Sequence, residues 1–526
     1  MRFFNTAGPV RCEDHYCLPP LTRFDLAEIL TLIDQKKYFV LHAPRQTGKT
    51  STLLALMDYL NQEGKYSRLY FNVEMAQSAR EDVSRGMRTI LGKMASQARD
   101  FLRDPFLDDI WEDMLNKYGG EGALEEILRR WAQVSPNPLV LLIDEIDALI
   151  GDTLISVLRQ LRAGYPNRPS LFPQSIVLCG VRDVRDYRLY SDREKAIITG
   201  GSAFNIKAKS LRLGNFDQAG IETLYAQHTQ ETGQQFASET LDMIWDLTQG
   251  QPWLVNALGY ETCFEMTRGR ERSQPITVEM VIEAKENLIL RRETHLDQLA
   301  DKLQEERVRC VIEPILAGGG KPDRLSEDDV QYVEDLGLIS TRGQLRIANR
   351  IYQEVIPRAL TYTTQLTISQ EPSWYIRAED GRLDADKLLV AFQQFFRQHS
   401  KHWVERFDYK EPGPQLLLQA FLQRIVNSGG RIEREYGLGH LRTDLLLIWP
   451  YPGGVQQIVI ELKLVNGSLS STIGKGLQQT WEYADRCGTD EAHLVIFDRD
   501  KSKTWEEKIF SRQETYRGKQ IKIWGM

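Results

Sequence analysis

The sequence of 526 residues predicts an α/β protein in which a parallel sheet is followed by helices and by a second α/β region. Two observations predict the first sheet. An apolar run at residues 38–41 leads through a tight loop ending in Gly-Lys-Thr (48–50) into a helical pattern, and a second apolar run at 139–143 ends in two carboxylates. The second sheet is predicted by three short strand patterns between residues 431 and 464.

Length and charge limit the classes of protein. A single core rarely serves more than about 300 residues, so the length predicts three or four domains. The formal net charge of −7 excludes a uniformly basic nucleic-acid coat protein, although local basic faces remain compatible with it. There is no apolar run near the roughly 18 residues of a membrane span, and the N-terminus lacks the apolar core of a secretion signal. We expect a cytoplasmic protein with no membrane partner.

The cysteines predict a reducing compartment. Their spacing shows no disulfide pattern. Cys12, His15 and Cys17 lie close enough to suggest a metal site, but no second pair of ligands follows at a finger-like spacing. The favoured alternative is an extended segment, residues 12–21, packed against the nucleotide domain. The six cysteines are Cys12, Cys17, Cys179, Cys263, Cys310 and Cys487.

The loop after the first strand has the residue types that bind a nucleoside triphosphate. Its backbone N–H groups and the following helix N-terminus would face the phosphates, Lys49 would reach the β and γ oxygens, and Thr50 would ligate Mg²⁺. Ala43 stands where the pattern's first glycine is usual. We expect ATP and Mg²⁺ as cofactors. The predicted cofactor-binding residues are Ala43, Pro44, Arg45, Gln46, Thr47, Gly48, Lys49, Thr50, Ser51 and Asp144.

The apolar run at residues 139–143 predicts a strand buried on both faces, with Asp144 and Glu145 where it leaves the sheet. Asp144 would hold Mg²⁺ through water, and Glu145 would polarise the attacking water. The alternative is a buried strand followed by solvated acidic residues.

A further buried strand is predicted at residues 174–180. It ends in Cys-Gly where a polar sensor residue is common, so the sensing role falls to Arg182 or Asp183, or is absent. Arg185 and Arg188 are candidates for stabilising the charge of the reacting phosphate, either in their own subunit or across a subunit boundary. The alternative is that they form ordinary surface ion pairs.

These motifs resemble the additional-strand branch of P-loop ATPases, in particular the AAA-like ATPases of prokaryotic mobile and defence elements. The resemblance covers roughly residues 20–290. It rests on the loop, on the acidic strand, and on residues 180–188 and 248–256, with several strands expected between the loop and the acidic strand. It implies a helical lid, a homo-oligomer and a defence or mobile-element role.

Helices replace strands from residue 215. They are predicted at 219–231, 238–248, 252–266 and 278–292. The order of helix, helix and hairpin that follows is typical of a winged helix, closed by a short helix that Pro357 would cut or kink. Its would-be recognition helix is acidic and would be repelled by phosphates, so a structural or protein-contact role is favoured and a transcriptional switch is the weakest hypothesis.

The second α/β region carries charged residues on apolar strands. Asp444 begins one strand, and Glu461 and Lys463 point to the same face of the next because strand side chains alternate. Charges there are costly unless they serve chemistry. Asp444, Glu461 and the Leu462 carbonyl are hard oxygen ligands for Mg²⁺, and Lys463 would orient a water or stabilise charge.

This pattern resembles the PD-(D/E)XK nuclease fold, with nucleic acid, DNA favoured, as the implied partner. Gln479 and Tyr483 share a helix face and resemble the Gln-x-x-x-Tyr element, so they would touch the substrate or Lys463. The preceding helix often supplies a Glu to the metal site, but Gln415 and Gln419 stand there, so cleavage would require Mn²⁺ or a second subunit.

The basic residues near the C-terminus admit two interpretations. Interleaved with Trp505 and Tyr516, they would line a phosphate-tracking face, or form an ordinary solvated helix and edge strand. They are Lys501, Lys503, Lys508, Arg512, Arg517, Lys519 and Lys522.

The sequence therefore predicts an AAA-like ATPase that controls a metal-dependent nuclease. The alternative is a regulatory ATPase whose C-terminal domain binds nucleic acid or a protein without cutting. The predicted domains are a lead-in (1–20), a P-loop ATPase core (21–213), a helical lid (214–293), a winged-helix-like module (294–362), a linker (363–384) and a nuclease-like domain (385–526).

Overall fold

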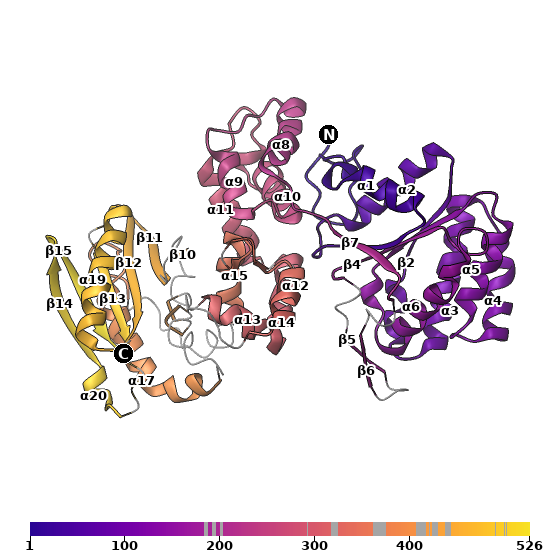
Figure 1. Cartoon of the computed structure of the whole chain (residues 1–526). Helices are drawn as coiled ribbons and strands as arrows, with labels where there is room; N and C mark the ends of the chain where they lie inside the picture. Colours follow the sequence, from indigo (N-terminus) through magenta and orange to yellow (C-terminus); the bar gives the residue numbers. More distant parts are fainter. Residues whose placement is uncertain are drawn as a thin grey trace. The chain divides into compact units, whose positions relative to one another are not determined.

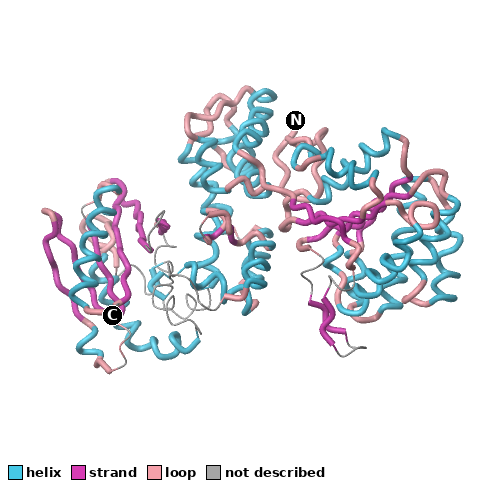
Figure 2. Tube along the Cα trace, viewed as in Figure 1, coloured by secondary structure: helices cyan, strands magenta, loops and turns pink. Residues whose placement is uncertain are grey.

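The computed structural model forms two compact units, each described here by itself (Figures 1 and 2). The first comprises Met1–His295 with Gln331–Leu338, and the second Leu296–Val330 with Ile339–Met526. The structure describes residues 1–183, 188–191, 196–199, 204–291, 293–316, 325–343, 345–360, 375–406, 417–419, 421–422, 430–436, 443–465, 467–489, 491–498, 500 and 502–526.

The first unit is built on a five-stranded parallel sheet with the order β2-β3-β4-β1-β7. This arrangement confirms the predicted α/β fold. The expectation of several strands between the loop and the acidic run is wrong, because only β2 intervenes along the chain. What separates β1 from β3 in the sheet is β4, which comes later in the sequence. The strands are β1 (Tyr38–His42), β2 (Ser67–Asn72), β3 (Leu139–Asp144), β4 (Ser175–Gly180) and β7 (Lys207–Arg212).

Helices cover both faces of this sheet (Figure 1). The central strands β3 and β4 are buried along their whole length, as parallel strands under two helical layers must be. Alternate residues of β3 enter different cores: Val140 and Leu142 pack with α1 and α2, and Leu141 and Ile143 pack with the other layer. The helices are α1 (Leu26–Asp34) and α2 (Lys49–Glu63) on one face, and α3 (Val83–Gln97), α4 (Phe106–Tyr118), α5 (Ala123–Val134) and α6 (Gly151–Gly164) on the other.

A group of helices, called the lid below, follows the sheet where the pattern from residue 215 predicts helices. Pro252 occupies the first turn of its third helix, where the missing N–H costs least. The side chains of Asp217 and Thr277 cap two of the helices by accepting hydrogen bonds from first-turn backbone N–H groups. The lid helices are α8 (Gln218–Thr232), α9 (Thr240–Thr248), α10 (Pro252–Tyr260) and α11 (Val278–Leu290).

The next elements have the order expected of a winged helix. The closing helix is not cut at Pro357, because α15 runs on through this residue, which is buried with Ile351 and Ile356. Packing of this apolar face offsets the hydrogen bond that the proline cannot donate. The elements are α12 (Thr294–Lys302), α13 (Glu306–Leu316), α14 (Glu327–Asp335), β8 (Ile339–Ser340), β9 (Arg346–Ile347) and α15 (Arg350–Leu360).

The C-terminal region contains a six-stranded mixed sheet with the order β10-β11-β12-β13-β15-β14. The antiparallel pairing of β10, β11 and β12 confirms the predicted meander, and α19 then crosses over to β13, which is parallel to β12. The strands are β10 (Arg431–Tyr436), β11 (Thr443–Tyr451), β12 (Gly454–Leu464), β13 (Glu491–Phe497), β14 (Phe510–Tyr516) and β15 (Lys519–Gly525), and the helices are α17 (Ala385–Arg406), α19 (Leu469–Arg486) and α20 (Trp505–Lys508).

Three further features complete the description. A short antiparallel pair, β5 (Arg188–Ser191) and β6 (Ala196–Thr199), lies between β4 and β7 in the chain. In the predicted linker, residues 363–374 lie outside the described part of the chain, whereas Tyr375 and Leu383 are buried in the C-terminal core. None of the helices in the described ranges is both long and apolar enough to span a bilayer.

Candidate functional site

The loop between β1 and α2 has the backbone shape that close approach to an anion requires. Gly48 is the N-cap of α2 with a φ of 90°, and a Cβ there would lie 2.9 Å from Nη1 of Arg23. Gln46 also has a positive φ of 55°. The Thr47 hydroxyl donates to the Pro44 carbonyl oxygen at 2.7 Å, which holds the loop closed. The N-terminus of α2 therefore points its free N–H groups into this loop.

Lys49 lies buried within the loop. Its Nζ donates to the carbonyl oxygens of Ala43 and Pro44, each at 3.2 Å. These acceptors are neutral, so the lysine keeps its positive charge available for an anionic ligand. Phosphate oxygens would be stronger acceptors than the two carbonyls.

The ends of three elements meet around Asp144, which is fully buried. The Thr50 hydroxyl donates to Asp144 Oδ2 at 2.7 Å, and the hydroxyl of Tyr70 donates to the same oxygen at 3.1 Å. The register of β2 with β3 sets Asn72 opposite Asp144, and this pairing brings Tyr70 to the carboxylate. Burial raises the pKa of Tyr70, which therefore stays protonated as a donor. The predicted pair of Thr50 and Asp144 is thus brought together.

Glu145 follows Asp144 in a left-handed conformation, with a φ of 57°. Its backbone N–H donates to Asp144 Oδ1 at 3.0 Å. Burial raises the pKa of the Glu145 carboxyl, and the positive charge of Lys49 acts in the opposite direction. A carboxylate with a raised pKa is a better general base than an exposed one.

The structure at the end of β4 explains why a glycine, Gly180, stands where a polar sensor residue is expected. A Cβ on Gly180 would lie 2.5 Å from Oδ1 of Asp147, and that same oxygen accepts a hydrogen bond from Val181 N at 3.0 Å. The glycine makes room for the Asp147 carboxylate. Cys179 is buried in the core between the sheet and α1 and α2, where burial raises the pKa of its thiol.

The predicted sensor residues are held in ion pairs within the first unit. Asp183 pairs with Lys207 of β7, and both side chains are buried. Arg182 Nε lies 3.7 Å from Oδ2 of Asp335 at the end of α14, and its guanidinium lies over the Tyr332 ring. Arg185 lies outside the described residues, and only the backbone of Arg188, in β5, is described.

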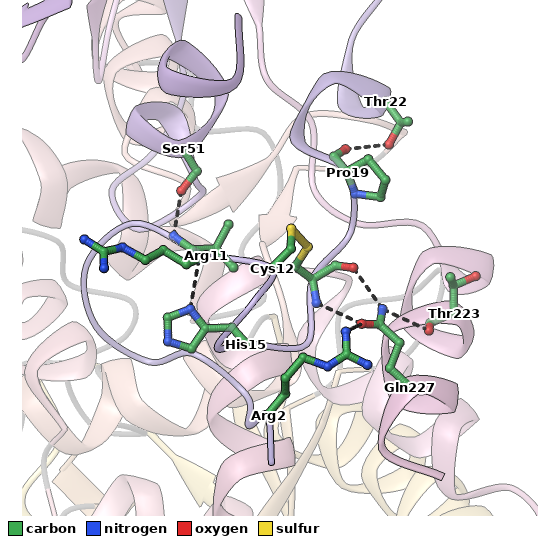
Figure 3. Close-up of a disulfide and its surroundings, with 11 residues drawn as sticks. Arg2, Arg11, Cys12, His15, Pro19, Thr22, Ser51, Thr223 and Gln227 are labelled. Carbon is green, nitrogen blue, oxygen red and sulfur yellow. Dashed lines mark hydrogen bonds between the residues drawn. A yellow bond between two sulfur atoms is a disulfide. The ribbon is translucent and has the colours of Figure 1, made fainter. Parts of the chain in front are cut away.

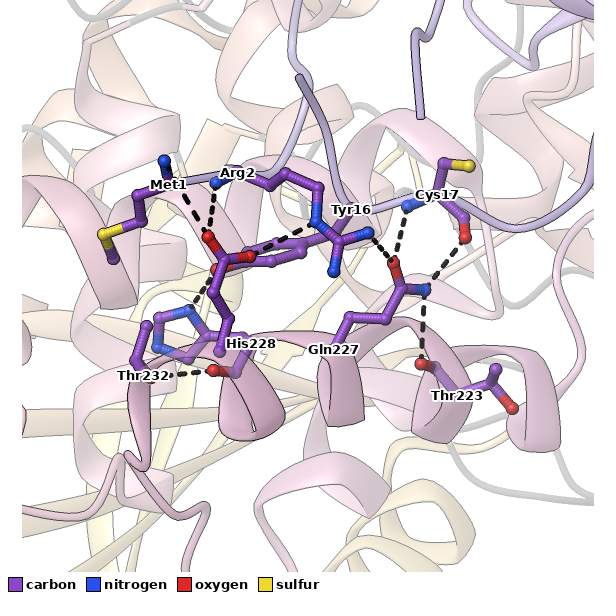
Figure 4. A network of polar contacts seen from close by, with 9 residues as sticks. Met1, Arg2, Tyr16, Cys17, Thr223, Gln227, His228 and Thr232 are labelled. Carbon is purple, nitrogen blue, oxygen red and sulfur yellow. Dashed lines mark hydrogen bonds and ion pairs between the residues drawn. The ribbon is translucent and has the colours of Figure 1, made fainter. Parts of the chain in front are cut away.

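An N-terminal segment, residues 1–19, covers the loop and joins it to the lid (Figures 3 and 4). Val10 N donates to the Ser51 hydroxyl oxygen at 3.0 Å. On the lid side, Gln227 accepts from Cys17 N at 3.2 Å and donates to Cys17 O at 2.8 Å. The predicted lead-in, residues 12–21, is divided in its packing: Leu21 packs against the core that contains α1 and α2, whereas Cys17 contacts the lid.

Cys12 and Cys17 form a disulfide, which corrects the expectation from cysteine spacing (Figure 3). Backbone hydrogen bonds from Asp14 and His15 to the Arg11 carbonyl make a turn that brings the two cysteines together. The metal interpretation of Cys12, His15 and Cys17 fails with it, because both sulfur atoms are used in the covalent bond.

A cavity lies beside the loop, between the N-terminal segment and α10. The Trp253 indole N–H forms part of its closure by donating to Thr6 O at 2.9 Å. Arg23 donates to the carbonyl oxygens of Thr47 and Gly214 and lies over the Phe216 ring at 5.0 Å, and burial lowers the pKa of its guanidinium to about 10. The residues that line the cavity include Asn5, Val10, Gln46, Thr47, Phe216 and Trp253.

The second charged site lies on the C-terminal sheet. Asp444 of β11 is paired directly with Glu461 of β12 in the antiparallel register, and Glu461 forms an ion pair with Lys463. Glu461 is fully buried, and the Lys463 side chain is 16% exposed. Val459 of the same strand packs with α19, so alternation places Glu461 and Lys463 on the α19 face. Only the backbone of Asp444 is described.

The helix α19 brings the predicted Gln479 and Tyr483 to this face. Tyr483 is buried in the cluster that contains Val459, and Gln479 Oε1 is buried without a hydrogen-bond partner in the described part of the chain. The side chain of Leu462 enters the opposite core, as alternation requires.

The two glutamines expected near the metal site are placed differently. Gln415 lies outside the described residues. Gln419 is buried, and its neighbours Leu418 and Phe421 pack in the core on the face opposite Glu461. Within the described ranges, no three His, Cys, Asp or Glu side chains gather as a metal-binding group.

A family model described as an AAA-like domain matches residues 28–355, which is more than half of the chain. The chain belongs to this AAA-like family. The match includes the loop, the acidic strand and the helical lid, and it establishes the protein as a P-loop ATPase of the AAA-like type. No curated protein matches the chain.

Three solved structures are similar to this AAA-like chain at low sequence identity. A Walker-type ATPase of Pyrococcus abyssi has 15% identity and a TM-score of 0.46, with 67% of this chain and 99% of that chain covered. Cdc6p from Pyrobaculum aerophilum has 15% identity and a TM-score of 0.35, covering 65% and 93%. The RuvB Holliday junction branch migration motor of Thermotoga maritima has 13% identity and a TM-score of 0.32, covering 63% and 95%.

Sequence reasoning missed three residues of the AAA-like site: Arg23, Tyr70 and Asp147. Tyr70 lies in a strand that was predicted, but strand register is needed to set it beside Asp144. Asp147 comes two residues after Glu145, and the glycine at 180 is a signal of close approach. Arg23 had no signal, because its partners are 24 and 191 residues away in the chain.

Proposed function

We propose that this AAA-like ATPase controls a metal-dependent nuclease site in its own C-terminal domain. The ATPase assignment follows from the family. The nuclease assignment is supported chiefly by one observation, the direct pairing of Asp444 with Glu461 beside Lys463.

At the nucleotide site, the donor set fits Mg²⁺. The Thr50 hydroxyl and the buried Asp144 carboxylate are hard oxygen ligands that already lie within hydrogen-bonding distance of each other. When bound, Mg²⁺ would neutralise charge on the β and γ phosphates. Lys49 would bind the same phosphates, and Glu145 would take a proton from the attacking water. The base and sugar would lie in the cavity between the N-terminal segment and α10.

At the C-terminal site, the register pairs two acidic residues on adjacent strands, and oxygen donors of this kind are the ligands that Mg²⁺ or Mn²⁺ takes. Asp444, Glu461 and the Leu462 carbonyl would hold it. Lys463 would orient the attacking water or stabilise charge on the phosphate, and Gln479 and Tyr483 of α19 would contact the substrate backbone. The proposed substrate is nucleic acid, with DNA favoured.

The decisive experiment is a cleavage assay on the full chain. Plasmid, linear DNA, single strands and RNA are incubated with Mg²⁺ or Mn²⁺, with and without ATP, beside Lys49→Ala, Lys463→Ala and the control Lys475→Ala. Lys475 lies on α19 and is exposed. We expect products from wild type and the control, none from Lys463→Ala, and a loss in Lys49→Ala if ATP is the controller. Cleavage that survives Lys463→Ala would refute the nuclease site.

The second candidate is a regulatory ATPase whose C-terminal domain binds without cutting. Gln415 and the C-terminal basic residues favour it, whereas Gln419 lies in the core on the face opposite Glu461 and has no bearing on it. Most of those residues are already engaged: Lys503 pairs with Asp498, Lys522 with Asp386, and Arg512 with Glu514, while Arg517 lies over the Trp481 ring. Lys501 lies outside the described residues. Binding that depends on ATP, with no product under any metal, would establish this alternative.

We further propose a cytoplasmic homo-oligomer, in which Arg185 or Arg188 stabilises charge at the nucleotide of a neighbouring copy. A defence or mobile-element role is part of this proposal. Sedimentation with and without ATP tests the oligomer, and an unchanged monomer in both conditions would contradict it.

A further inference from the structure

We propose that Cys12 and Cys17 are a thiol–disulfide exchange site that sets the nucleotide affinity of the AAA-like domain, with dithiol reductants as its reactants. The inference rests on the proposed nucleotide position, because the disulfide acts through one wall of that cavity. The N-terminal segment supplies much of the wall, through Asn5, Thr6, Ala7, Gly8, Val10, Tyr16, Cys17 and Leu18.

The disulfide lies between the two points at which this segment is anchored. On one side, Val10 is bonded to Ser51, the residue directly after the Mg²⁺-ligand candidate Thr50. On the other side, Cys17 is bonded through both backbone groups to Gln227 of α8 in the lid (Figure 4). The bond between Cys12 and Cys17 closes the short loop between these anchors. It therefore fixes the distance over which the segment bridges the P-loop helix and the lid.

Further contacts make the oxidised segment a rigid wall. The Tyr16 hydroxyl shares a hydrogen bond of 3.1 Å with the buried His228 of α8, and Arg2 pairs with Glu231 one helical turn further on (Figure 4). The ring of Phe4 packs on those of Tyr16 and Tyr225. These contacts do not involve the disulfide and hold residues before and after the loop in either redox state, so reduction would loosen the chain between Val10, which lines the cavity, and Tyr16.

The disulfide is reachable from solvent. Cys12 is exposed and Cys17 is partly buried, whereas Cys179 and Cys263 are buried thiols. Exposed disulfides are the ones that exchange readily with thiols and serve regulation.

The exchange reaction balances with a dithiol as the reductant. One thiolate of the dithiol attacks the exposed sulfur of Cys12, the bond to Cys17 breaks, and Cys17 leaves as a thiolate that takes up a proton. The second thiol of the reductant then attacks the mixed disulfide and releases Cys12. The protein gains two electrons and two protons, and the dithiol becomes a disulfide.

Reduction would weaken nucleotide binding because the wall would have to be ordered on each binding event. In the chain-entropy model, a cross-link that closes so short a loop reduces the conformational freedom of the unlinked chain by a factor of roughly ten or more. If reduction returns part of that freedom to the N-terminal segment of the unliganded protein, nucleotide binding has to restrict it again. The affinity for nucleotide then falls by about three- to tenfold.

The test measures the dissociation constant and the dissociation rate of a fluorescent ATP analogue on the full chain, oxidised and after treatment with dithiothreitol. Thiol titration of the denatured protein verifies each state. The chain has six cysteines, of which four are free in the oxidised form. The double variant Cys12→Ser/Cys17→Ser removes the exchange site, and Cys310→Ser/Cys487→Ser is the matched control that keeps it.

We expect weaker binding and faster release on reduction of wild type and of the control, and a double Cys12/Cys17 variant that behaves as reduced protein in both conditions. Equal affinity in the oxidised and reduced wild type would overturn this inference and leave the nucleotide site standing. A reductant response that persists in the double variant would also overturn it. Absence of analogue binding in both states would instead overturn the nucleotide site, and this inference with it.

Discussion

The two charged sites of this chain hold their lysines in different ways. Lys49 donates to two neutral backbone carbonyls, whereas Lys463 is paired with the buried carboxylate of Glu461. A buried cation held by neutral oxygens attracts an anion directly, so the first site suits a triphosphate. The charge of Lys463 is already balanced, so that site gains a net positive charge only when a cation joins its carboxylates. The first site is therefore suited to an anion, whereas the second is proposed to bind a metal before it binds an anion.

The largest effect is expected from the removal of Lys49, which tests whether the first site binds an anion. Lys49→Ala deletes the charge that would meet the β and γ phosphates, and we expect ATP hydrolysis to fall by about 10³-fold or more. Phosphate release measures this effect. Lys117→Ala, an exposed lysine in the last turn of α4, is the control and should hydrolyse ATP at the wild-type rate. Near-normal ATP hydrolysis by Lys49→Ala would contradict the assignment of Lys49 to the phosphates.

The corresponding change at the second site is Glu461→Gln. It removes a proposed metal ligand and leaves Lys463 without its carboxylate, and we expect nucleic-acid cleavage to fall by about 10²-fold or more while ATP hydrolysis is retained. Gel analysis of cleavage products, beside phosphate release, separates the two activities. Glu514→Gln on the edge strand β14 is the control. Equal cleavage by both variants would remove Glu461 from the site.

A pH measurement sharpens the electrostatic side of the comparison. Burial lowers the pKa of His42, at the end of β1, to about 4, with Asp183 raising it and Arg212, Lys207 and Lys49 lowering it. An unfolded histidine titrates near 6.5, so between these values the unfolded chain binds a proton that the folded chain does not. Stability must therefore fall as the pH drops through 6.5 toward 4, by about 2 kcal/mol at pH 5.

Unfolding free energies from urea titrations at pH 7 and pH 5 measure this loss. His42→Asn removes the titrating group, so the variant should lose less stability than wild type over the same interval, by about 2 kcal/mol. An identical loss in both proteins would show that His42 is protonated normally in the folded state.

The smallest expected effect is that of Tyr70→Phe. It deletes the hydroxyl that donates to Asp144 but keeps the ring, so the carboxylate loses one of its orienting partners. We expect kcat for ATP hydrolysis to fall by about fivefold with little change in ATP affinity. Tyr118→Phe, an exposed tyrosine at the end of α4, should have no effect.

Much of the nucleotide site could be predicted because its signals are local. The loop, the strand before it and the helix after it are contiguous, and the acidic pair ends a run of five apolar residues, 139–143. Periodicity and short motifs carry such information within a few residues. The same holds for the meander and for the shared face of Glu461 and Lys463, which follow from strand alternation.

The features that sequence reasoning missed depend on distant contacts or on polar elements. The edge strand β7 has an exposed, Lys-rich sequence, so it shows no apolar alternation. It forms because Lys207 is neutralised by Asp183 and because β1 offers a free edge for pairing. The disulfide needs a turn at Arg11, and Arg23 needs the chain to bring Thr47 and Gly214 together. None of these arrangements can be predicted from the spacing of residues in the sequence alone.

The most direct test of the account is to measure ATP binding and ATP hydrolysis side by side in Glu145→Gln. The variant keeps the loop, Lys49, Thr50 and Asp144, and it removes only the carboxylate that would take the proton from water. The account predicts wild-type affinity for ATP with hydrolysis slowed by about 10²-fold or more. Wild-type hydrolysis would contradict the role of Glu145, and loss of binding would contradict the separation of phosphate binding from water activation on which the site is built.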